Sequence, residues 1–444
     1  MIPLDSTTSL GSKPSSAGAL MTTTERLLLV SFLAVMVAGG TSRLQSQSTA
    51  PPPVTVTTAA GDHVVIQIQA DDRAPRDVAA VGALVLKVDD RESQQVLLTP
   101  GTGRTTYEAL VGPLTAGPHR ITVDRSELWS WPAGLAIGSV TGRIVAADAD
   151  EGVVLRYAPT LGVRADTVGT ASDVPLVMYA EDDRRQGRGW IRYSVIISNE
   201  DGGTPPPALM ARWGRTTDIE LIYEVEVDGV RIVSDRFQGP DHEVRAFAGT
   251  REGQHPQLLV ATLNNMFIDR GKSIANVRPV PRVVNLNRRT RESVMDDSPW
   301  IYPLMARELI AEKRIGTQIE DPREFLYVEA GLALENAAAS VRVGSDAGGW
   351  QDSTRGRADL AVNRNGWVRI AVHAPASSPT LKWECRAAPG ASAGSQPRCQ
   401  IEWGRVFRLG KDYLPGENVV SPGKVQMGAG LSEPIPLADR GPAR

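Results

Sequence analysis

Two carboxylates stand two residues apart where a polar loop leads into an apolar, alternating segment. Asp218 and Glu220 follow Arg215 in the sequence RWGRTTDIE. In an extended strand both carboxylates project from the same face, where Arg215 is close enough to orient them. Carboxylates arranged in this way suit a divalent cation or the hydroxyls of a sugar. An ordinary solvated strand face has the same spacing, and it remains the alternative.

A second group of ionisable side chains lies on a predicted turn with the sequence GPDHE. Asp241, His242 and Glu243 are consecutive there. Neighbouring side chains on a turn can point to a common centre, where His with Asp and Glu forms half of a metal site or an acid–base pair. A plain surface turn is the alternative.

The adjacent amides Asn264 and Asn265 complete the candidate site if the strands that carry all these groups are neighbours, because amides next to carboxylates suit sugar hydroxyls or Ca²⁺. The predicted ligand-binding residues are therefore Arg215, Asn264 and Asn265. The predicted metal ligands are Asp218, Glu220, Asp241, His242 and Glu243. The expected cofactor is a divalent cation, Ca²⁺ or Mg²⁺, and no catalytic residue is assigned.

The elements that must position these groups are predicted to be strands. From Val54 onward, short alternating or β-branched runs recur about every ten residues, and Gly, Pro and Asp separate them. This pattern is typical of β-sandwiches. We predict an all-β protein with a signal peptide and linker over 1–53, an immunoglobulin-like sandwich over 54–152, a larger sandwich over 153–412 and an extended tail over 413–444. One helix is expected within the larger sandwich, over 299–314, because Ser298 and Pro299 form a helix start.

Export is indicated near the N-terminus. Residues 27–40 (LLLVSFLAVMVAGG) form an uncharged apolar run after Arg26. A membrane span needs about 20 apolar residues, so the run predicts a signal peptide. Contact with a membrane is expected only through this segment, if it stays uncleaved. The expected location is secreted, periplasmic or in the cell envelope.

The cysteines agree with export. Cys385 and Cys399 are the two cysteines of the chain. We predict a disulfide between them that closes a loop of small residues, flanked by the two strands of a long hairpin.

Composition excludes one class of partner. The chain has 444 residues, with Lys+Arg 48 against Asp+Glu 51 and a net charge of −3. Binding to nucleic acid relies on an excess of basic residues, so a nucleic-acid partner is not expected.

Five segments follow one another between residues 155 and 265: LRYAP at 155–159, IRYSV at 191–195, NEDGG at 199–203, GRTTDIE at 214–220 and HPQLLVA at 255–261. Their order and sequence resemble those of the necrosis-inducing (NPP1-like) and vacuolar-sorting-62-like β-sandwich proteins. The family heptapeptide is GHRHDWE, so the Gly, Asp and Glu are kept, whereas Arg215, Thr217 and Ile219 replace its two histidines and its tryptophan. The resemblance implies a β-sandwich in which this segment lies near a divalent metal and a sugar-binding site. The stretch 54–125 resembles immunoglobulin-like modules in general, which implies a fold and no function.

Three functions follow as alternatives. The first is an exported protein that binds a carbohydrate or another envelope component, with a divalent cation as a possible aid. The second is a secreted glycoside or ester hydrolase, with an acid–base pair drawn from Glu220, Asp241 and Glu243. The third is a structural surface protein that associates with itself.

Overall fold

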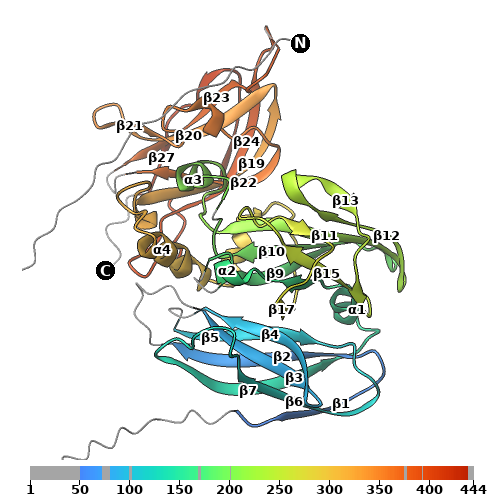
Figure 1. Cartoon of the computed structure of the whole chain (residues 1–444). Coiled ribbons are helices and arrows are strands. Elements are labelled where there is room, and N and C mark those ends of the chain that lie inside the picture. The colour runs from blue at the N-terminus through green and yellow to red at the C-terminus, as the bar shows by residue number, and fades with distance from the viewer. Residues whose placement is uncertain are drawn as a thin grey trace, which may run out of the picture. The chain divides into compact units, whose positions relative to one another are not determined.

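The computed structural model describes residues 51–72, 81–99, 103–168, 172–200, 202–374, 378–392 and 394–438 (Figure 1). All of them belong to one compact unit. The predicted signal segment, 27–40, lies outside the described residues. Within the described ranges, no helix has the length and apolar character needed to cross a membrane. Strands predominate over helices, so the predicted all-β class is confirmed.

Residues 54–145 form the N-terminal sandwich, in which two antiparallel sheets have the orders β1-β6-β3-β4 and β5-β2-β7. The strands are β1 (Val54–Thr58), β2 (His63–Asp72), β3 (Gly82–Val88), β4 (Arg91–Leu98), β5 (Arg104–Val111), β6 (Gly117–Arg125) and β7 (Leu135–Val145). Alternate residues point inward, as His119, Ile121 and Val123 do in β6. The first strand pairs with the sixth and the last with the second. In an antibody constant domain the first and second strands share a sheet, so the two terminal strands have exchanged sheets here.

The middle region holds two sheets that share one apolar core. Their orders are β13-β12-β11-β10-β9-β18 and β14-β15-β8-β17, and β16 pairs with β15. The strands are β8 (Thr160–Gly162), β9 (Pro175–Asp182), β10 (Arg188–Ile197), β11 (Asp218–Asp228), β12 (Arg231–Gln238), β13 (Val244–Ala246), β14 (Arg251–Glu252), β15 (His255–Val260), β16 (Phe267–Ile268), β17 (Asn276–Val277) and β18 (Arg282–Val283). The alternating acidic segment of the sequence is therefore a strand, β11, at the interior of the larger sheet.

Short helices lie between the strands. They are α1 (Asp150–Arg156), α2 (Ala165–Val168), α3 (Pro206–Trp213), α4 (Ile301–Ala311) and the 3₁₀ helices η1 (Pro240–His242), η2 (Arg291–Asp297), η3 (Pro322–Glu324) and η4 (Ala358–Leu360). α4 lies inside the predicted helix, 299–314, and α1 spans the predicted domain boundary at 152–153. α3 is an additional helix in a Pro-rich stretch. It begins at Pro206, and Gly214 ends it in the left-handed conformation, with φ 59°.

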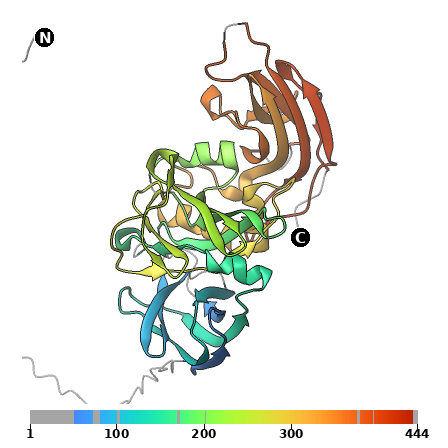
Figure 2. The same cartoon turned by 90° about the vertical axis from the view of Figure 1, so that its right-hand side faces the viewer.

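Residues 325–436 form the C-terminal sandwich, which has a core of its own (Figures 1 and 2). Its sheets have the orders β22-β19-β24-β25 and β21-β20-β23-β26, with β27 on β23. The strands are β19 (Phe325–Glu335), β20 (Ala337–Ser345), β21 (Gly349–Asp352), β22 (Gly366–His373), β23 (Thr380–Ala387), β24 (Arg398–Phe407), β25 (Gly423–Met427), β26 (Gly430–Leu431) and β27 (Ile435–Pro436). The last three lie in the stretch predicted as an extended tail, 413–444. Each pairs at the edge of a sheet, and the Gly- and Pro-rich sequence around them hides the alternation.

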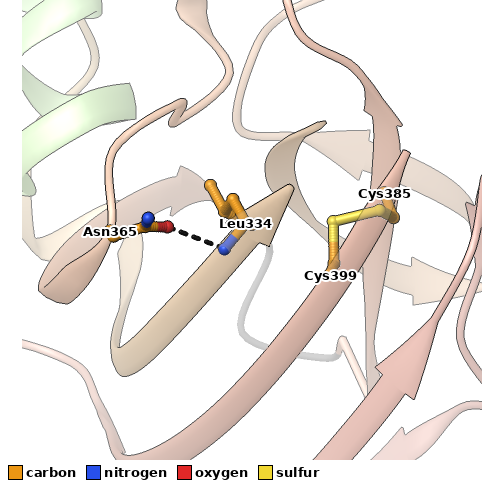
Figure 3. The surroundings of a disulfide bond; sticks show 4 residues. All are labelled: Leu334, Asn365, Cys385 and Cys399. Atoms are coloured by element: carbon orange, nitrogen blue, oxygen red, sulfur yellow. Dashed lines mark hydrogen bonds between the residues drawn. A yellow bond between two sulfur atoms is a disulfide. The ribbon is translucent and has the colours of Figure 1, made fainter. Parts of the chain in front are cut away.

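Cys385 and Cys399 form the predicted disulfide, with their Cα atoms 6.0 Å apart (Figure 3). The predicted hairpin is not formed, because Cys385 lies in β23 and Cys399 in β24, and these strands belong to different sheets. The bond is buried and joins the two layers of the C-terminal sandwich. A disulfide that persists in this way is typical of an oxidising compartment such as the cell exterior.

Candidate functional site

The predicted pair Asp218 and Glu220 stands at the start of β11, directly after the turn that follows α3. Asp218 is 2% exposed. Its Oδ2 accepts a hydrogen bond from Asn265 Nδ2 at 3.0 Å. Its Oδ1 accepts one from the Ile219 amide at 2.8 Å and lies 3.6 Å from Arg215 Nη1. The structure thus brings Arg215, Asp218 and Asn265 together, as predicted, although around a buried carboxylate.

Glu220 lies close to the predicted turn, residues 241–243. Its Oε2 accepts a hydrogen bond from Gln238 Nε2 at 2.6 Å and lies 3.9 Å from His242 Nδ1. Gln238 Nε2 is also 3.1 Å from His242 Nδ1. Burial, and next the charge of Asp218, raise the pKa of Glu220 well above its usual value, so this carboxyl group keeps its proton to a higher pH than a free one.

The five predicted metal ligands do not converge on one point. Asp241 and Glu243 are exposed, and Glu243 forms an ion pair with Arg245 at 2.6 Å. The described part of the chain holds no group of three or more His, Cys, Asp or Glu side chains arranged for a metal ion. The reason is the turn itself: Asp241 and His242 both have positive φ, and only His242 comes near Glu220.

Glu200 is a member of this cluster that the pattern of paired carboxylates misses. It is 8% exposed, and its Oε1 accepts a hydrogen bond from the Thr204 amide at 2.6 Å. Asn264, with its side-chain amide oriented to suit its neighbours, donates to the same carboxylate. Burial, and next the charge of Asp218, raise the pKa of Glu200 to about 7. The signal in the sequence is the NEDGG turn, because a Cβ at Gly203, where φ is +109°, would collide with both Glu200 and Asn264.

Glu200, Asp218 and Glu220 therefore form one acidic cluster. Each of the three carboxyl groups accepts a hydrogen bond from another group of the protein. Asn265 is fully buried and also donates to the Asn199 carbonyl at 2.9 Å. The chemistry that this cluster can perform is to hold protons near neutral pH. Its hydrogen bonds tie β10, β11 and the loop after β15 together. A sugar would have to displace these contacts to reach the carboxylates.

A more open candidate lies on the C-terminal sandwich, and we call it the Trp367 hollow. Alternate residues of β19, β22 and β24 fill the core, so the residues between them face the opposite side of the sheet. Gly331, Trp367, Glu402 and Lys424 form one row across β19, β22, β24 and β25, since Gly331 pairs with Trp367 and Glu402, and Glu402 with Lys424. These four residues line the hollow together with Leu332, Ala333, Gly366, Gln400, Ile401, Val425 and Gln426.

The indole of Trp367 lies across the backbone of two neighbouring strands. A Cβ built on Gly331 would be 3.0–3.3 Å from three atoms of the ring, and one built on Gly404 would be 3.6 Å from it. The absence of side chains at these two glycines gives the ring its place on the sheet. The same tryptophan is one of the residues that line the hollow.

Charged groups stand at the rim of the Trp367 hollow. Glu402 pairs with Lys424 at 3.1 Å and with Arg288. The Arg288 side chain is 61% exposed, and its guanidinium lies 5.8 Å from the Trp367 ring centroid. Alternation in the sequence marks these positions as one face of a sheet, but it does not distinguish a half-buried tryptophan such as Trp367 from a tryptophan in the core.

Comparisons with known proteins give no family. No family model matches the chain, and no curated protein matches it. One solved structure, the M60 catalytic domain with the CBM51-1 and CBM51-2 domains from Clostridium perfringens ZmpB, is 10% identical, with a TM-score of 0.14. The match covers 76% of this chain and 32% of that one, so the chain spans about a third of that structure's length. A TM-score this low supports no inference, and the resemblance to the necrosis-inducing proteins stays a prediction.

Proposed function

We propose that the protein is exported and binds a glycan of the cell envelope or the extracellular space, with a sugar ring packed on Trp367. The observation that carries the proposal is the indole ring that lies across Gly331 and Gly404 and lines the hollow. The C–H groups on one face of a sugar ring pack well against the electron-rich face of an indole. Aromatic residues are frequent anchors of binding sites for this reason.

The rim supplies the polar groups that such a ligand needs. Binding sites for small molecules combine an apolar surface with a few polar groups that fix orientation. Gln400, Glu402, Lys424 and Gln426 provide donors and acceptors around the ring. The signal-like segment 27–40 and the disulfide support a place outside the cytoplasm, where glycans are accessible.

The test is calorimetric titration of the mature protein with chitohexaose, cellohexaose, xylohexaose and mannohexaose. We expect Trp367→Ala to weaken the binding of the preferred sugar at least tenfold, which corresponds to about 1.4 kcal/mol. Trp350→Ala is the matched control, since Trp350 is a half-buried tryptophan on β21 that stacks with Lys382. Equal losses in both variants, or no Trp367-dependent binding to any of the sugars, would contradict the proposal.

The role of a divalent cation is part of the same proposal. Ca²⁺ and Mg²⁺ aid sugar binding where carboxylates and sugar hydroxyls share the ion. The titration is therefore repeated with 2 mM Ca²⁺, with 2 mM Mg²⁺ and with EDTA, concentrations of the order at which weak extracellular calcium sites fill. Unchanged affinity in EDTA would remove the cation from the proposal and leave the glycan in it.

A further inference from the structure

Three arginines surround one indole where α3 ends. Trp213 is the last residue of α3, and α3 packs against β22 (Figure 1). The guanidinium of Arg212 lies 4.7 Å from the ring centroid of Trp213, that of Arg364 lies 5.2 Å from it, and that of Arg215 lies 6.0 Å from it. Arg364 Nη2 also donates to the Arg212 carbonyl at 2.6 Å, which fixes one arginine against the other.

The carboxylates near this group form direct ion pairs with only one of the three arginines, although Glu292 attracts Arg364 and Asp359 attracts Arg212 at longer range. Arg215 lies 3.6 Å from Asp218 and 3.6 Å from Glu292. Among the described residues, Arg212 and Arg364 have no carboxylate partner, and Arg212 Nε and Arg364 Nη1 are buried without a hydrogen-bond acceptor. Buried charge without a partner is costly, so natural proteins rarely keep it without a purpose.

The electrostatics agree with an excess of positive charge. The pKa of Arg364 falls to about 10, first because of burial; the charge of Glu292 opposes this fall, whereas Arg291, Arg212 and Arg215 add to it. An anion beside Arg364 would oppose the fall in the same way as Glu292.

The group lies at the edge of the core. Arg212, Trp213 and Arg364 are half-buried residues, although Arg212 Nε and Arg364 Nη1 are covered. Stacking on the indole holds the planar guanidinium forks in place, which reduces the entropy lost when they take a ligand. Guanidinium forks match the geometry of carboxylate, sulfate and phosphate groups.

We infer that Arg212, Trp213 and Arg364 form a binding site for an oxyanion, the carboxylate, sulfate or phosphate group of a ligand. The site is separate from the Trp367 hollow and does not depend on sugar binding there. The two guanidiniums bind the oxygen atoms of the anion, and Trp213 keeps the two forks oriented toward it.

The experiment is calorimetric titration of the full mature chain with sodium sulfate, sodium phosphate and sodium glucuronate at constant ionic strength against sodium chloride. We expect saturable binding of at least one of the three anions, and a loss of tenfold or more in both Arg212→Gln and Arg364→Gln. The three anions distinguish a free inorganic ion from the carboxylate of an acidic sugar.

Arg120→Gln is the matched control, because it removes the same charge from an exposed arginine on β6 that pairs with Asp90 at 2.9 Å. It should bind the anion within twofold of the wild type. No saturable binding in the wild type, or equal weakening in the control, would overturn the inference. If Arg364→Gln fails to fold by circular dichroism, Arg212→Gln alone decides, since Arg212 donates no hydrogen bond to the described residues whose loss could unfold the protein.

Discussion

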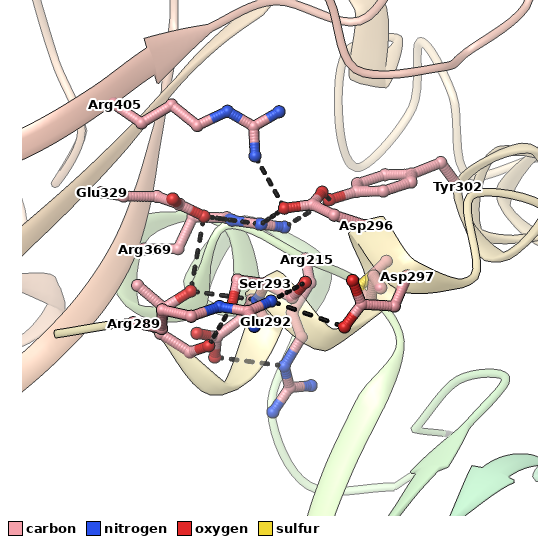
Figure 4. Close-up of polar contacts among 12 residues, drawn as sticks. Arg215, Arg289, Glu292, Ser293, Asp296, Asp297, Tyr302, Glu329, Arg369 and Arg405 are labelled. Carbon is pink, nitrogen blue, oxygen red and sulfur yellow. Dashed lines mark hydrogen bonds and ion pairs between the residues drawn. The ribbon is translucent and has the colours of Figure 1, made fainter. Parts of the chain in front are cut away.

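Two arginines of the same chain segment, Arg364 and Arg369, lie in opposite electrostatic surroundings. Arg369 is fully buried, and Glu329 accepts two hydrogen bonds from it, at 2.6 and 2.9 Å (Figure 4). It also donates to the Tyr302 hydroxyl at 2.9 Å, and Tyr302 in turn donates to Asp296 at 2.6 Å. Arg364 has one backbone carbonyl instead.

The difference separates a structural joint, the charge network around Arg369, from the candidate anion site that includes Arg364. Around Arg369, Asp296 also accepts a hydrogen bond from Arg405 at 2.6 Å, so charges of both signs are matched between η2, α4 and the C-terminal sheet. This network holds elements together. Around Arg364, positive charge is in excess, and a ligand is the partner that would balance it. Arg369 is also the more buried of the two, and it is the one whose charge is paired.

The largest expected effect is in the joint. Glu329→Ala leaves the Arg369 guanidinium buried with fewer partners, and we expect the free energy of unfolding to fall by about 4 kcal/mol. Urea denaturation measures this fall. The double variant Glu329→Leu, Arg369→Met removes both charges and should recover a large part of the loss. A fall below about 1 kcal/mol in Glu329→Ala would show that the joint is not what holds these elements.

An intermediate effect on stability is expected at the acidic cluster of Glu200, Asp218 and Glu220, which contacts Arg215 through Asp218. The pKa of Glu200 is about 7 in the folded protein, above the usual value of 4.5, so the folded state keeps a proton that the unfolded state releases. The stability contributed by this group is therefore full below pH 4.5 and is lost as the pH rises to 7.

Glu200→Gln tests this pH dependence because the amide cannot ionise and keeps an acceptor for the Thr204 amide. At pH 8 we expect it to be more stable than the wild type by on the order of 3 kcal/mol, and at pH 4 to be equal to it. Thermal denaturation across this pH range is the measurement. Parallel curves for the two proteins would contradict the raised pKa.

The smallest effect is expected at Arg364, and it bears most directly on the comparison. Arg364→Gln removes a charge that has no carboxylate partner, so we expect a change of less than about 1 kcal/mol, of either sign, in the free energy of unfolding. Urea denaturation beside Glu329→Ala checks it. If both variants lost the same stability, the distinction between joint and site would fail.

Much of the fold could be predicted from particular residues. The alternation over 219–227 predicts β11, Ser298 with Pro299 predicts a helix close to α4, and the two cysteines predict their own bond. These predictions succeed because they depend on local period or on the lack of another partner. The short edge strands near the C-terminus carry too few residues for a period to be visible, and they are missed.

The acidic cluster was predicted in part, again because the spacing of residues along a strand is a local property. Spacing placed Asp218 and Glu220 on one strand, and the structure brings Asn265 and His242 to them. It did not reveal that Asp218 is buried, that Glu200 joins the cluster, or that Asp241 and Glu243 turn to solvent. Each of these depends on how a loop packs against a sheet.

The sequence by itself determined the strand-rich class, the sulfur bridge and the absence of a nucleic-acid-binding charge excess, because side-chain alternation, cysteine number and net charge are properties of the chain alone. The tertiary structure decided which charges are matched. Arg364 and the Arg212 carbonyl that it contacts are 152 positions apart in the chain. No local pattern links residues so distant, and only packing determines whether such an arginine meets a carboxylate, an indole or the space for a ligand.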